Sequence, residues 1–315
     1  MKSSDLKILF AGLTIVLAMA AKGNSAADKP SADLPRRTPV IVSSTPKRSL
    51  TSAQISGLFA PEPVAVKKFP IRTDWTLLEP VLKVKAGVAK DLDSNVDMYR
   101  FNSAERWALA SLTKLMSAII AVENVGSEKI VTISEKTMAV DGISGNLKLG
   151  EQYEVSELVT AMLTVSSNRA AAAIADFYGE QKFVDAMQTK ASVLGMTSTT
   201  FVEPTGLSFL NQGSVEDLEK LAAYIYKNHP EIFEITRQKS VEIHGNYLLN
   251  INSFAQTRSD FWGGKTGFTD MAGGNLVTVF NHEGRKLLFI VLGTDDRFGQ
   301  TDMLYNWAKS AFVFK

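Results

Sequence analysis

The amino-acid sequence predicts an α+β fold: an antiparallel sheet built from both ends of the ordered region, flanked by helices, with a helical lobe inserted. Strand-like segments occur over residues 84–101 and again over 240–292, whereas helical patterns dominate residues 105–236. The chain has 315 residues, of which 45% are hydrophobic, so it can bury one sizeable core.

Residues 1–27 have the pattern of a secretory signal peptide. Lys2 and Lys7 supply a basic start, and residues 8–21 form an apolar run of 14 residues, which is short for a membrane span. Small residues at 25–27 offer a cleavage site. We expect an exported protein of the periplasm or cell envelope, and an uncleaved N-terminal anchor is the alternative.

Residues 28–70 hold seven of the ten prolines, which predicts an extended linker rather than a packed domain. The folded domain is therefore expected over residues 71–315. The chain contains no cysteine, so no disulfide framework is available. Its formal net charge of +1 gives no electrostatic sign of nucleic-acid binding.

The ordered region begins with two strand-like segments, 84–92 and 96–101, which flank a hairpin turn at Asp93-Ser94-Asn95. A mostly apolar helical run follows over 110–125, and we expect it to be buried. Further apolar helical segments are predicted at 155–165 and 170–178.

The pattern then returns from helix to strand. Ser214, followed by Val-Glu-Asp, predicts the capped start of one more helix. Four strands and a closing helix over about 301–311 complete the chain. The predicted strands cover residues 240–244, 260–268, 275–281 and 286–292, with Asn281-His-Glu-Gly as the turn between the last two.

Three short motifs, widely spaced along the chain, indicate chemistry. The first is Ser111-Leu-Thr-Lys114, in the apolar helical run. Residues i and i+3 share one face of a helix, so the Lys114 amine can reach the Ser111 hydroxyl. Burial and the helix dipole disfavour the charged lysine, which can then act as general base for a nucleophilic serine. A Ser-x-x-Lys match alone is weak, because two others occur in the chain.

The second motif is Ser166-Ser-Asn168, which is predicted to lie in a turn between two helical segments. There the Ser166 hydroxyl can relay a proton, and the Asn168 amide can hold a peptide carbonyl of a substrate. Ser144-Gly-Asn146 has the same spacing. It lies in a glycine-rich loop with no helix leading into it, and we interpret it as a turn only.

The third motif is Lys265-Thr266-Gly267, whose flanking glycines allow a ligand backbone to approach closely. Lys265 and Thr266 are expected to bind a carboxylate. The backbone N–H groups of Phe268 and Ser111 are expected to hold a developing oxyanion. The upstream glycine of a phosphate-binding loop is absent, so we do not assign a nucleotide site.

Together these motifs resemble those of the penicillin-recognising serine enzymes. Their flanks resemble the D-alanyl-D-alanine carboxypeptidase family of low-molecular-mass penicillin-binding proteins, over roughly residue 83 to the C-terminus. The segment Phe201-Val-Glu-Pro-Thr-Gly-Leu is most similar to members that act as endopeptidases on cross-linked peptidoglycan. The other flanks are Ala110-Ser-Leu-Thr-Lys-Leu-Met-Ser-Ala, Met162-Leu-Thr-Val-Ser-Ser-Asn-Arg-Ala and Gly264-Lys-Thr-Gly-Phe-Thr.

The resemblance implies a fold like that of DD-peptidases and β-lactamases. It implies that a peptidoglycan stem peptide acylates Ser111, with Lys114 as the base, and that β-lactam antibiotics are covalent inhibitors. Ser166 and Asn168 then line the cleft, and the third motif binds the terminal carboxylate. No metal or organic cofactor is implied. The resemblance does not decide between carboxypeptidase and endopeptidase action, and it does not give the oligomeric state.

Two alternatives remain. The first is a class A β-lactamase, which shares all three motifs. Such an enzyme needs a glutamate that activates the deacylating water, and Glu203 lies about where that glutamate would be sought. However, the Leu-Asn expected after the glutamate is missing, and Gly206-Leu207 stands there instead. A non-catalytic cell-wall binding module would keep the cleft without turnover. The three histidines match neither a Ser-His-Asp arrangement nor a metal-binding spacing.

Overall fold

The computed structural model describes residues 69–314. The predicted signal peptide, 1–27, and all but the last two residues of the predicted linker, 28–70, lie outside the described residues. Within the described part, no helix combines the length and the apolar character needed to cross a membrane.

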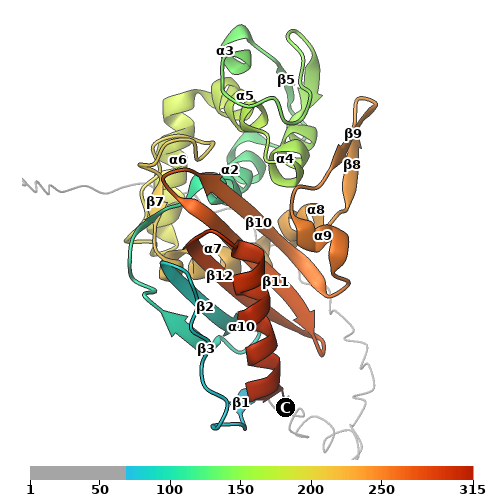
Figure 1. Ribbon diagram of the computed structural model, residues 1–315. Helices are drawn as coiled ribbons and strands as arrows, with labels where there is room; N and C mark the ends of the chain where they lie inside the picture. Colours follow the sequence, from blue (N-terminus) through green and yellow to red (C-terminus); the bar gives the residue numbers. More distant parts are fainter. Residues whose placement is uncertain (1–68, 315) are drawn as a thin grey trace, which may run out of the picture. The chain divides into compact units, whose positions relative to one another are not determined.

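A five-stranded antiparallel sheet forms the centre of the fold, with the strand order β10-β11-β12-β2-β3 (Figure 1). Strands from the two ends of the described region meet where β12 pairs with β2, from Leu287 opposite Asp91 to Leu292 opposite Ala86. The prediction of a single sheet built from both ends is confirmed. The strands are β2 (Ala86–Asp91), β3 (Val96–Phe101), β10 (Phe261–Thr269), β11 (Gly273–His282) and β12 (Arg285–Thr294).

Both predicted hairpin turns of this sheet are present. Asn95, between β2 and β3, has a φ of 63°. Glu283 and Gly284, between β11 and β12, have φ values of 52° and 82°. Asn and Gly tolerate this left-handed region, which the two-residue turn 283–284 requires and which Asn95 adopts at the end of the four-residue loop 92–95.

Each face of the sheet carries a hydrophobic layer, because side chains alternate along a strand. In β12, Leu288 and Ile290 belong to the core shared with the helical lobe, and Leu287 and Phe289 to a second core beneath α10 (Arg297–Ala311). Figure 1 shows α10 lying across one face of the sheet. This helix begins four residues before the predicted 301, because Asp296 caps it by accepting from the Gly299 N–H at 2.8 Å.

The helical lobe is inserted between β3 and β10, as predicted. The predicted helix over 110–125 is in fact three segments, a 3₁₀ turn, an α-helix and a π-helical turn, and every residue of the central one is buried. Ser214 caps α7 through the Asp217 N–H, which confirms that predicted start. The helices of the lobe are η1 (Ala110–Leu112), α2 (Thr113–Ile120), η2 (Ala121–Val125), α3 (Glu135–Met138), α4 (Val155–Thr164), α5 (Asn168–Tyr178), α6 (Glu180–Val193), α7 (Val215–Asn228), α8 (Pro230–Thr236) and α9 (Ser253–Thr257).

Four two-stranded pairs complete the described structure, and only one of these strands, β8, was predicted. Two pairs join distant segments, β1 with β13 and β4 with β7. The strands are β1 (Pro70–Arg72), β4 (Trp107–Ala108), β5 (Ile130–Thr132), β6 (Gln152–Glu154), β7 (Gln212–Gly213), β8 (Ser240–Ile243), β9 (Asn246–Leu249) and β13 (Phe312–Phe314).

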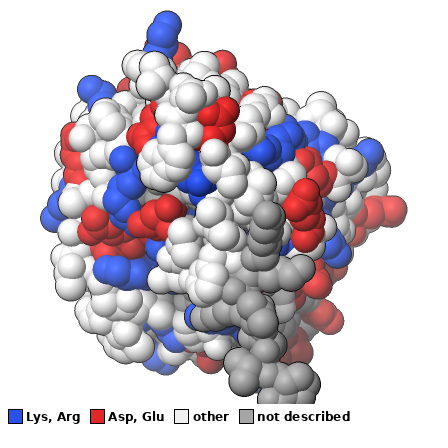
Figure 2. Space-filling model, turned by 90° about the horizontal axis from the view of Figure 1, so that it is seen from below, with Lys and Arg blue, Asp and Glu red and all other residues white. Residues whose placement is uncertain are grey.

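Charge is evenly mixed on the face of the molecule that Figure 2 shows, where basic and acidic side chains are interspersed over a largely uncharged surface. This agrees with the formal net charge of +1. A surface of this kind has no single-sign field that would attract a polyanion.

Candidate active site

Ser111 and Lys114 lie where the 3₁₀ turn η1 passes into α2. Ala110, just before the serine, has a φ of 49°, which turns the chain sharply at the helix start. Lys114 is fully buried, and its Nζ lies 3.0 Å from Ser111 Oγ. The predicted pairing of amine and hydroxyl is therefore present, although it spans a helix junction rather than one regular helix.

The Lys114 amine is held from three sides. It also donates to Asn168 Oδ1 at 2.6 Å and to the Thr205 carbonyl. Burial lowers the pKa of Lys114 from 10.5 to about 7, while the nearby Glu203 carboxylate acts in the opposite direction. Near neutral pH a large fraction of this lysine is therefore the free amine, which can accept a proton.

Ser166 occupies the turn between α4 and α5, as predicted, with a φ of 58°. Its Oγ accepts a hydrogen bond from Lys265 Nζ at 2.9 Å, so the second and third motifs meet across 99 residues of sequence. Ser167 caps α5 by accepting from the Ala170 N–H. Asn168 begins the helix, and its Nδ2 donates to the Asp141 carbonyl at 3.0 Å.

The loop around Ser144-Gly-Asn146, which we interpreted as a turn only, packs against the second motif. A Cβ on Gly145 would lie 2.9 Å from Ser167 Oγ, and a Cβ on Gly142 would lie 3.2 Å from Asn168 Nδ2. Both glycines also have φ near 100°. The loop is a turn, but its glycines let it support the side chains of the motif from outside.

The third motif lies on β10, the edge strand of the sheet that faces η1. Lys265 and Thr266 are buried. A Cβ on Gly267 would lie 2.9 Å from the Leu109 carbonyl and 3.2 Å from the Ser111 backbone nitrogen, so only a glycine allows this approach. The two predicted oxyanion donors, Ser111 N–H and Phe268 N–H, thereby lie on neighbouring stretches of backbone.

Lys265 is the second buried lysine of the site. Its Nζ also donates to the Thr266 carbonyl at 3.0 Å. Burial lowers the pKa of Lys265 well below its usual value, and the positive charges of Lys114 and Arg297 lower it further. Each buried lysine therefore donates to one serine hydroxyl, Lys114 to Ser111 and Lys265 to Ser166.

The sequence analysis missed Arg297, the first residue of α10. Its Nη1 donates to the Gly267 carbonyl at 3.1 Å, and its buried Nε has no hydrogen-bond partner among residues 69–314. Burial lowers the pKa of this guanidinium, but an arginine stays charged at neutral pH. A permanent cation thus adjoins the third motif, and no short motif marks it in the sequence.

Glu203 holds the loop that follows α6. Its carboxylate accepts five hydrogen bonds, from the backbone N–H groups of residues 205, 206 and 208, the Thr205 hydroxyl and Asn211 Nδ2. A carboxylate so fully engaged orders its loop. The arrangement gives no support to Glu203 as the water-activating base of a class A β-lactamase.

This loop is also fixed to α2, the helix that carries Lys114. Ser117 Oγ of α2 donates to the Pro204 carbonyl at 2.7 Å, and Asn211 Nδ2 lies 3.2 Å from Thr113 Oγ1. A Cβ on Gly206 would lie 1.9 Å from the Ala110 carbonyl oxygen. The loop therefore sets both the position of the Thr205 carbonyl, which Lys114 contacts, and the path of the backbone at η1.

His229 and His244 form contacts away from the three motifs. No group of three or more metal-ligating side chains occurs within 69–314. His229 pairs with Glu123 and Glu231, and His244 stacks on Tyr153, 4.3 Å between ring centroids. None of these contacts involves the three motifs.

Comparisons with known proteins agree with the geometry. A sequence profile described as D-alanyl-D-alanine carboxypeptidase matches residues 76–296. The chain is 31% identical over 269 residues to a D-alanyl-D-alanine endopeptidase of Escherichia coli, covering 81% of this chain and 85% of the relative. A D-alanyl-D-alanine endopeptidase of Pseudomonas aeruginosa is 30% identical over 252 residues, with 75% and 80% covered. A penicillin-binding protein of Listeria monocytogenes, solved in its ampicillin-bound form, gives a TM-score of 0.66 at 28% identity, over 74% of this chain and 99% of that chain.

Proposed function

The chain belongs to the D-alanyl-D-alanine carboxypeptidase family, and from this premise we propose how its own residues perform the reaction. It is a serine D-alanyl-D-alanine peptidase that acts on peptidoglycan. In the proposal, Ser111 is the nucleophile that becomes acylated. The observation that carries this assignment is the fully buried Lys114 amine, 3.0 Å from Ser111 Oγ.

Acylation begins when Ser111 Oγ attacks the carbonyl carbon of the scissile D-alanine peptide bond. A new C–O bond forms, and the hydroxyl proton passes to the Lys114 amine, whose lowered pKa of about 7 suits a base at neutral pH. The carbonyl oxygen becomes an oxyanion, which the backbone N–H groups of Ser111 and Phe268 hold.

The tetrahedral intermediate collapses by breaking the C–N bond. The leaving nitrogen needs a proton. The proton that Lys114 took from Ser111 passes to it through the Ser166 hydroxyl, which Lys265 positions, so that Lys114 is again a free amine. The carboxylate of the leaving group binds to Lys265 and Thr266, and the adjoining cation of Arg297 favours the same charge. Water then hydrolyses the ester and regenerates Ser111.

Within the family we propose endopeptidase action on cross-linked stem peptides. The support comes from the two endopeptidase relatives, which the chain matches over 85% and 80% of their length. In this reaction the leaving amine belongs to the D-centre of a neighbouring stem peptide, and the carboxylate on that centre takes the place of a terminal D-alanine carboxylate.

The setting of the reaction follows from the substrate. Peptidoglycan lies outside the cytoplasmic membrane, so we propose that residues 1–27 direct export to the periplasm or cell envelope. We also propose that β-lactam antibiotics acylate Ser111, and the ampicillin-bound form of the Listeria relative supports β-lactam binding at such a site. Both statements agree with the sequence features of the N-terminus and of the motifs.

The first test is intact-mass spectrometry of the purified protein mixed with benzylpenicillin. We expect a lasting adduct that maps to Ser111 and is lost in Ser111→Ala. Ser192→Ala, on the exposed side of α6, is the matched control and should acylate normally. Rapid loss of the drug without an adduct would instead identify a β-lactamase.

The second test separates the two peptidase activities. Uncross-linked pentapeptide muropeptides and D-alanine–cross-linked dimers are incubated with the enzyme in parallel. We expect conversion of the dimers to monomers at a kcat/KM at least tenfold above the release of free D-alanine. A higher rate on the pentapeptides would assign the enzyme as a carboxypeptidase.

A further inference from the structure

Lys265 and Ser166 come from different parts of the fold and meet through a single direct contact. Lys265 lies on β10, Ser166 lies in the turn after α4, and the hydrogen bond between their side chains is 2.9 Å long. Within residues 69–314, no other hydrogen bond joins β10 to the turn 165–168. One bond from a long lysine side chain does not fix the separation of a strand and a turn, so another part of the fold has to set it.

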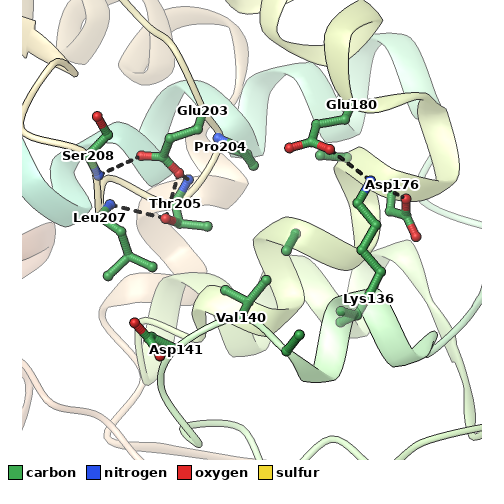
Figure 3. A pocket seen from close by; sticks show the side chains of 14 residues that line it. Lys136, Val140, Asp141, Asp176, Glu180, Glu203, Pro204, Thr205, Leu207 and Ser208 are labelled. Atoms are coloured by element: carbon green, nitrogen blue, oxygen red, sulfur yellow. Dashed lines mark hydrogen bonds and ion pairs between the residues drawn. The ribbon is translucent and has the colours of Figure 1, made fainter.

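A cavity of about 420 Å³ lies beside α5, the helix that begins at the second motif. Figure 3 shows the Lys136 ion pairs and the Glu203 loop on two of its sides, with Asp141 along a third edge. Asn168, the first residue of α5, donates to the Asp141 carbonyl at this edge. None of the described residues that line the cavity belongs to β10. This side of the second motif therefore does not connect it with the third.

The end of α4, just before the second motif, is bound by the segment that follows β9. The Ile251 N–H donates to the Thr164 carbonyl at 3.3 Å, and Thr164 is the last residue of α4, two positions before Ser166. Thr164 is fully buried. Because one residue separates this anchored position from Ser166, a shift of the segment at residue 251 should move the turn that presents the serine.

Asn250, the residue before this anchor, is buried and uses its whole amide. Its Nδ2 donates to the Thr236 and Gln238 carbonyls, both at 2.8 Å, and its Oδ1 accepts from the Asn252 N–H at 2.8 Å. These bonds join the end of α8 to the segment that holds α4. Breaking any of them would leave a buried polar group without a partner, so the amide fixes the backbone around it.

Thr236 continues the connection to β10. It is the last residue of α8 and is buried, and its Oγ1 accepts from the Gly264 N–H at 2.9 Å and donates to the Phe233 carbonyl at 2.9 Å. Because β10 is an edge strand, this hydroxyl supplies a partner on the side where the sheet has no further strand. A Cβ on Gly263 would lie 2.7 Å from Phe233 Cβ, so α8 packs directly on the strand. Lys265 follows immediately.

The other end of β10 is held by contacts of its own. Arg297 Nη1 donates to the Gly267 carbonyl at 3.1 Å, and the close approach of Gly267 to the Leu109 carbonyl sets the strand against η1. The bond from Gly264 to Thr236 lies on the other side of Lys265. Its loss should therefore displace Lys265 more than the Phe268 N–H of the proposed oxyanion site.

We propose that Asn250 and Thr236 are positioning residues that hold Lys265 against Ser166. Thr236 binds the strand that carries the lysine, and Asn250 binds the end of α8 to the segment that holds α4. Both act through Lys265 and Ser166 rather than on the substrate. The inference rests on the proposed function, because that function passes the proton for the leaving nitrogen through Ser166. It adds the residues that set the distance between the second and third motifs.

The chemistry of the leaving group provides a readout for this role. An amine leaves only when its nitrogen gains a proton, which the proposed mechanism delivers through Ser166. A thiolate leaves as the anion and takes up a proton from water afterwards, so a thioester is cleaved without this step. Moving Lys265 away from Ser166 should therefore slow cleavage of an amide more than cleavage of a thioester. A loss of folded protein slows both equally.

The test compares two donors with the same terminal carboxylate, Nα,Nε-diacetyl-L-lysyl-D-alanyl-D-alanine and its thioester analogue that ends in D-thiolactate. Thr236→Val removes the hydroxyl at nearly constant volume and leaves the Gly264 N–H without its acceptor. We expect kcat/KM to fall about tenfold on the amide, part of the roughly 10²-fold that a displacement of 1 Å can cost, and to stay within about twofold on the thioester. Asn250→Asp, which loses both bonds donated to carbonyls, should lower the amide-to-thioester ratio in the same direction.

Two control variants separate positioning from stability. Thr236→Ser keeps the hydroxyl and should keep the wild-type ratio. Thr199→Val removes another buried hydroxyl, which donates to Asp217 of α7 at 2.8 Å, and should lower stability without changing the ratio. An unchanged ratio in Thr236→Val, or an equal change in Thr199→Val, would overturn the inference alone. Failure of the wild type to cleave the amide donor would overturn the proposed function and this inference with it.

Discussion

At the residue scale, the proposed mechanism makes the reaction depend on the charge state of one lysine. Lys114 can take the Ser111 proton only as a free amine, and burial lowers the pKa of Lys114 to about 7. Because the base is the deprotonated form, the acylation rate should rise with pH through about 7 and then level off. Stopped-flow acylation by a fluorescent penicillin between pH 5.5 and 9 measures this profile, and a rate that falls over this range would contradict the assignment.

Replacing Lys114 by arginine separates the role of the base from that of the positive charge. Arginine stays charged across the range, so Lys114→Arg should acylate about 10²–10⁴-fold more slowly at every pH, without a rise near 7. Lys136→Arg is the control, since this exposed lysine only pairs with carboxylates and its replacement should leave the profile unchanged.

The residues of the three motifs could be predicted from the sequence because each motif is a fixed, local spacing of distinctive side chains. Arg297 and Asp141 could not. Arg297 reaches the site only because α10 begins beside Gly267, 30 residues away along the chain. Asp141 contributes its backbone carbonyl to Asn168, and every residue has a carbonyl, so sequence gives no signal for it.

At the element scale, the loop 203–208 gives a sharp test of what Glu203 does. Glu203→Gln replaces an acceptor of five hydrogen bonds by a group that accepts fewer, so we expect a loss of about 1–3 kcal/mol in the free energy of unfolding and slower acylation. The Glu203 charge raises the pKa of Lys114, so the acylation profile should also shift to lower pH. Urea unfolding and the pH profile measure these effects.

The same variant distinguishes a positioning residue from a base that activates water. If Glu203 drove deacylation, Glu203→Gln would acylate at the wild-type rate and its penicillin adduct would persist much longer. Following the adduct by intact mass over hours therefore decides between the two roles.

The close packing of β10 against η1 is a second property at this scale. Gly267→Ala would place a Cβ 2.9 Å from the Leu109 carbonyl and 3.2 Å from the Ser111 nitrogen, which pushes the strand away from the nucleophile. A displacement approaching 1 Å can reduce catalysis about 10²-fold, so we expect acylation to fall by roughly this factor.

Gly284→Ala provides the contrast. A Cβ at Gly284 would meet open space, but the residue has a φ of 82°. The substitution should therefore cost about 1–2 kcal/mol of stability and leave the acylation rate unchanged. If Gly267→Ala and the wild type acylated at equal rates, β10 and the 3₁₀ turn η1 would not be held at a fixed separation.

Elements with strong local signals could be predicted, and elements defined by distant partners could not. The hairpin strands of the sheet and the helix capped by Ser214 follow from turn residues, alternation and capping. β1 and β13 are three residues each and exist because Pro70 pairs with Phe314, the opposite end of the described chain. The predicted helix over 110–125 begins as a 3₁₀ turn because the backbone at Ala110, with a φ of 49°, packs against Gly267 of β10, a tertiary requirement that overrides local propensity.

At the scale of the whole molecule, the sheet joins the beginning and the end of the domain, and a buried ion pair marks the junction. Asp91, at the end of β2, is fully buried and accepts from Arg285 at the start of β12. The paired strands place this junction at the end of the sheet opposite Gly267, because Arg285 pairs with His282, whereas Gly274 pairs with Phe268. Stability and catalysis should therefore respond separately to changes here.

Asp91→Asn tests this separation. Removing the carboxylate leaves Arg285, whose side chain is only 11% exposed, without its counter-charge, so we expect the free energy of unfolding to fall by about 3 kcal/mol and Tm by roughly 10 °C. Acylation by penicillin at 20 °C should be unchanged, because the junction contacts none of the three motifs. Glu79→Gln removes one partner of the exposed Arg72–Glu79 pair, 3.1 Å apart, and should cost less than about 1 kcal/mol. Equal destabilisation by the two variants would mean that burial of the Asp91–Arg285 ion pair adds nothing to stability. A loss of acylation in folded Asp91→Asn would mean that the pairing of β2 with β12 controls the catalytic geometry from the far end of the sheet.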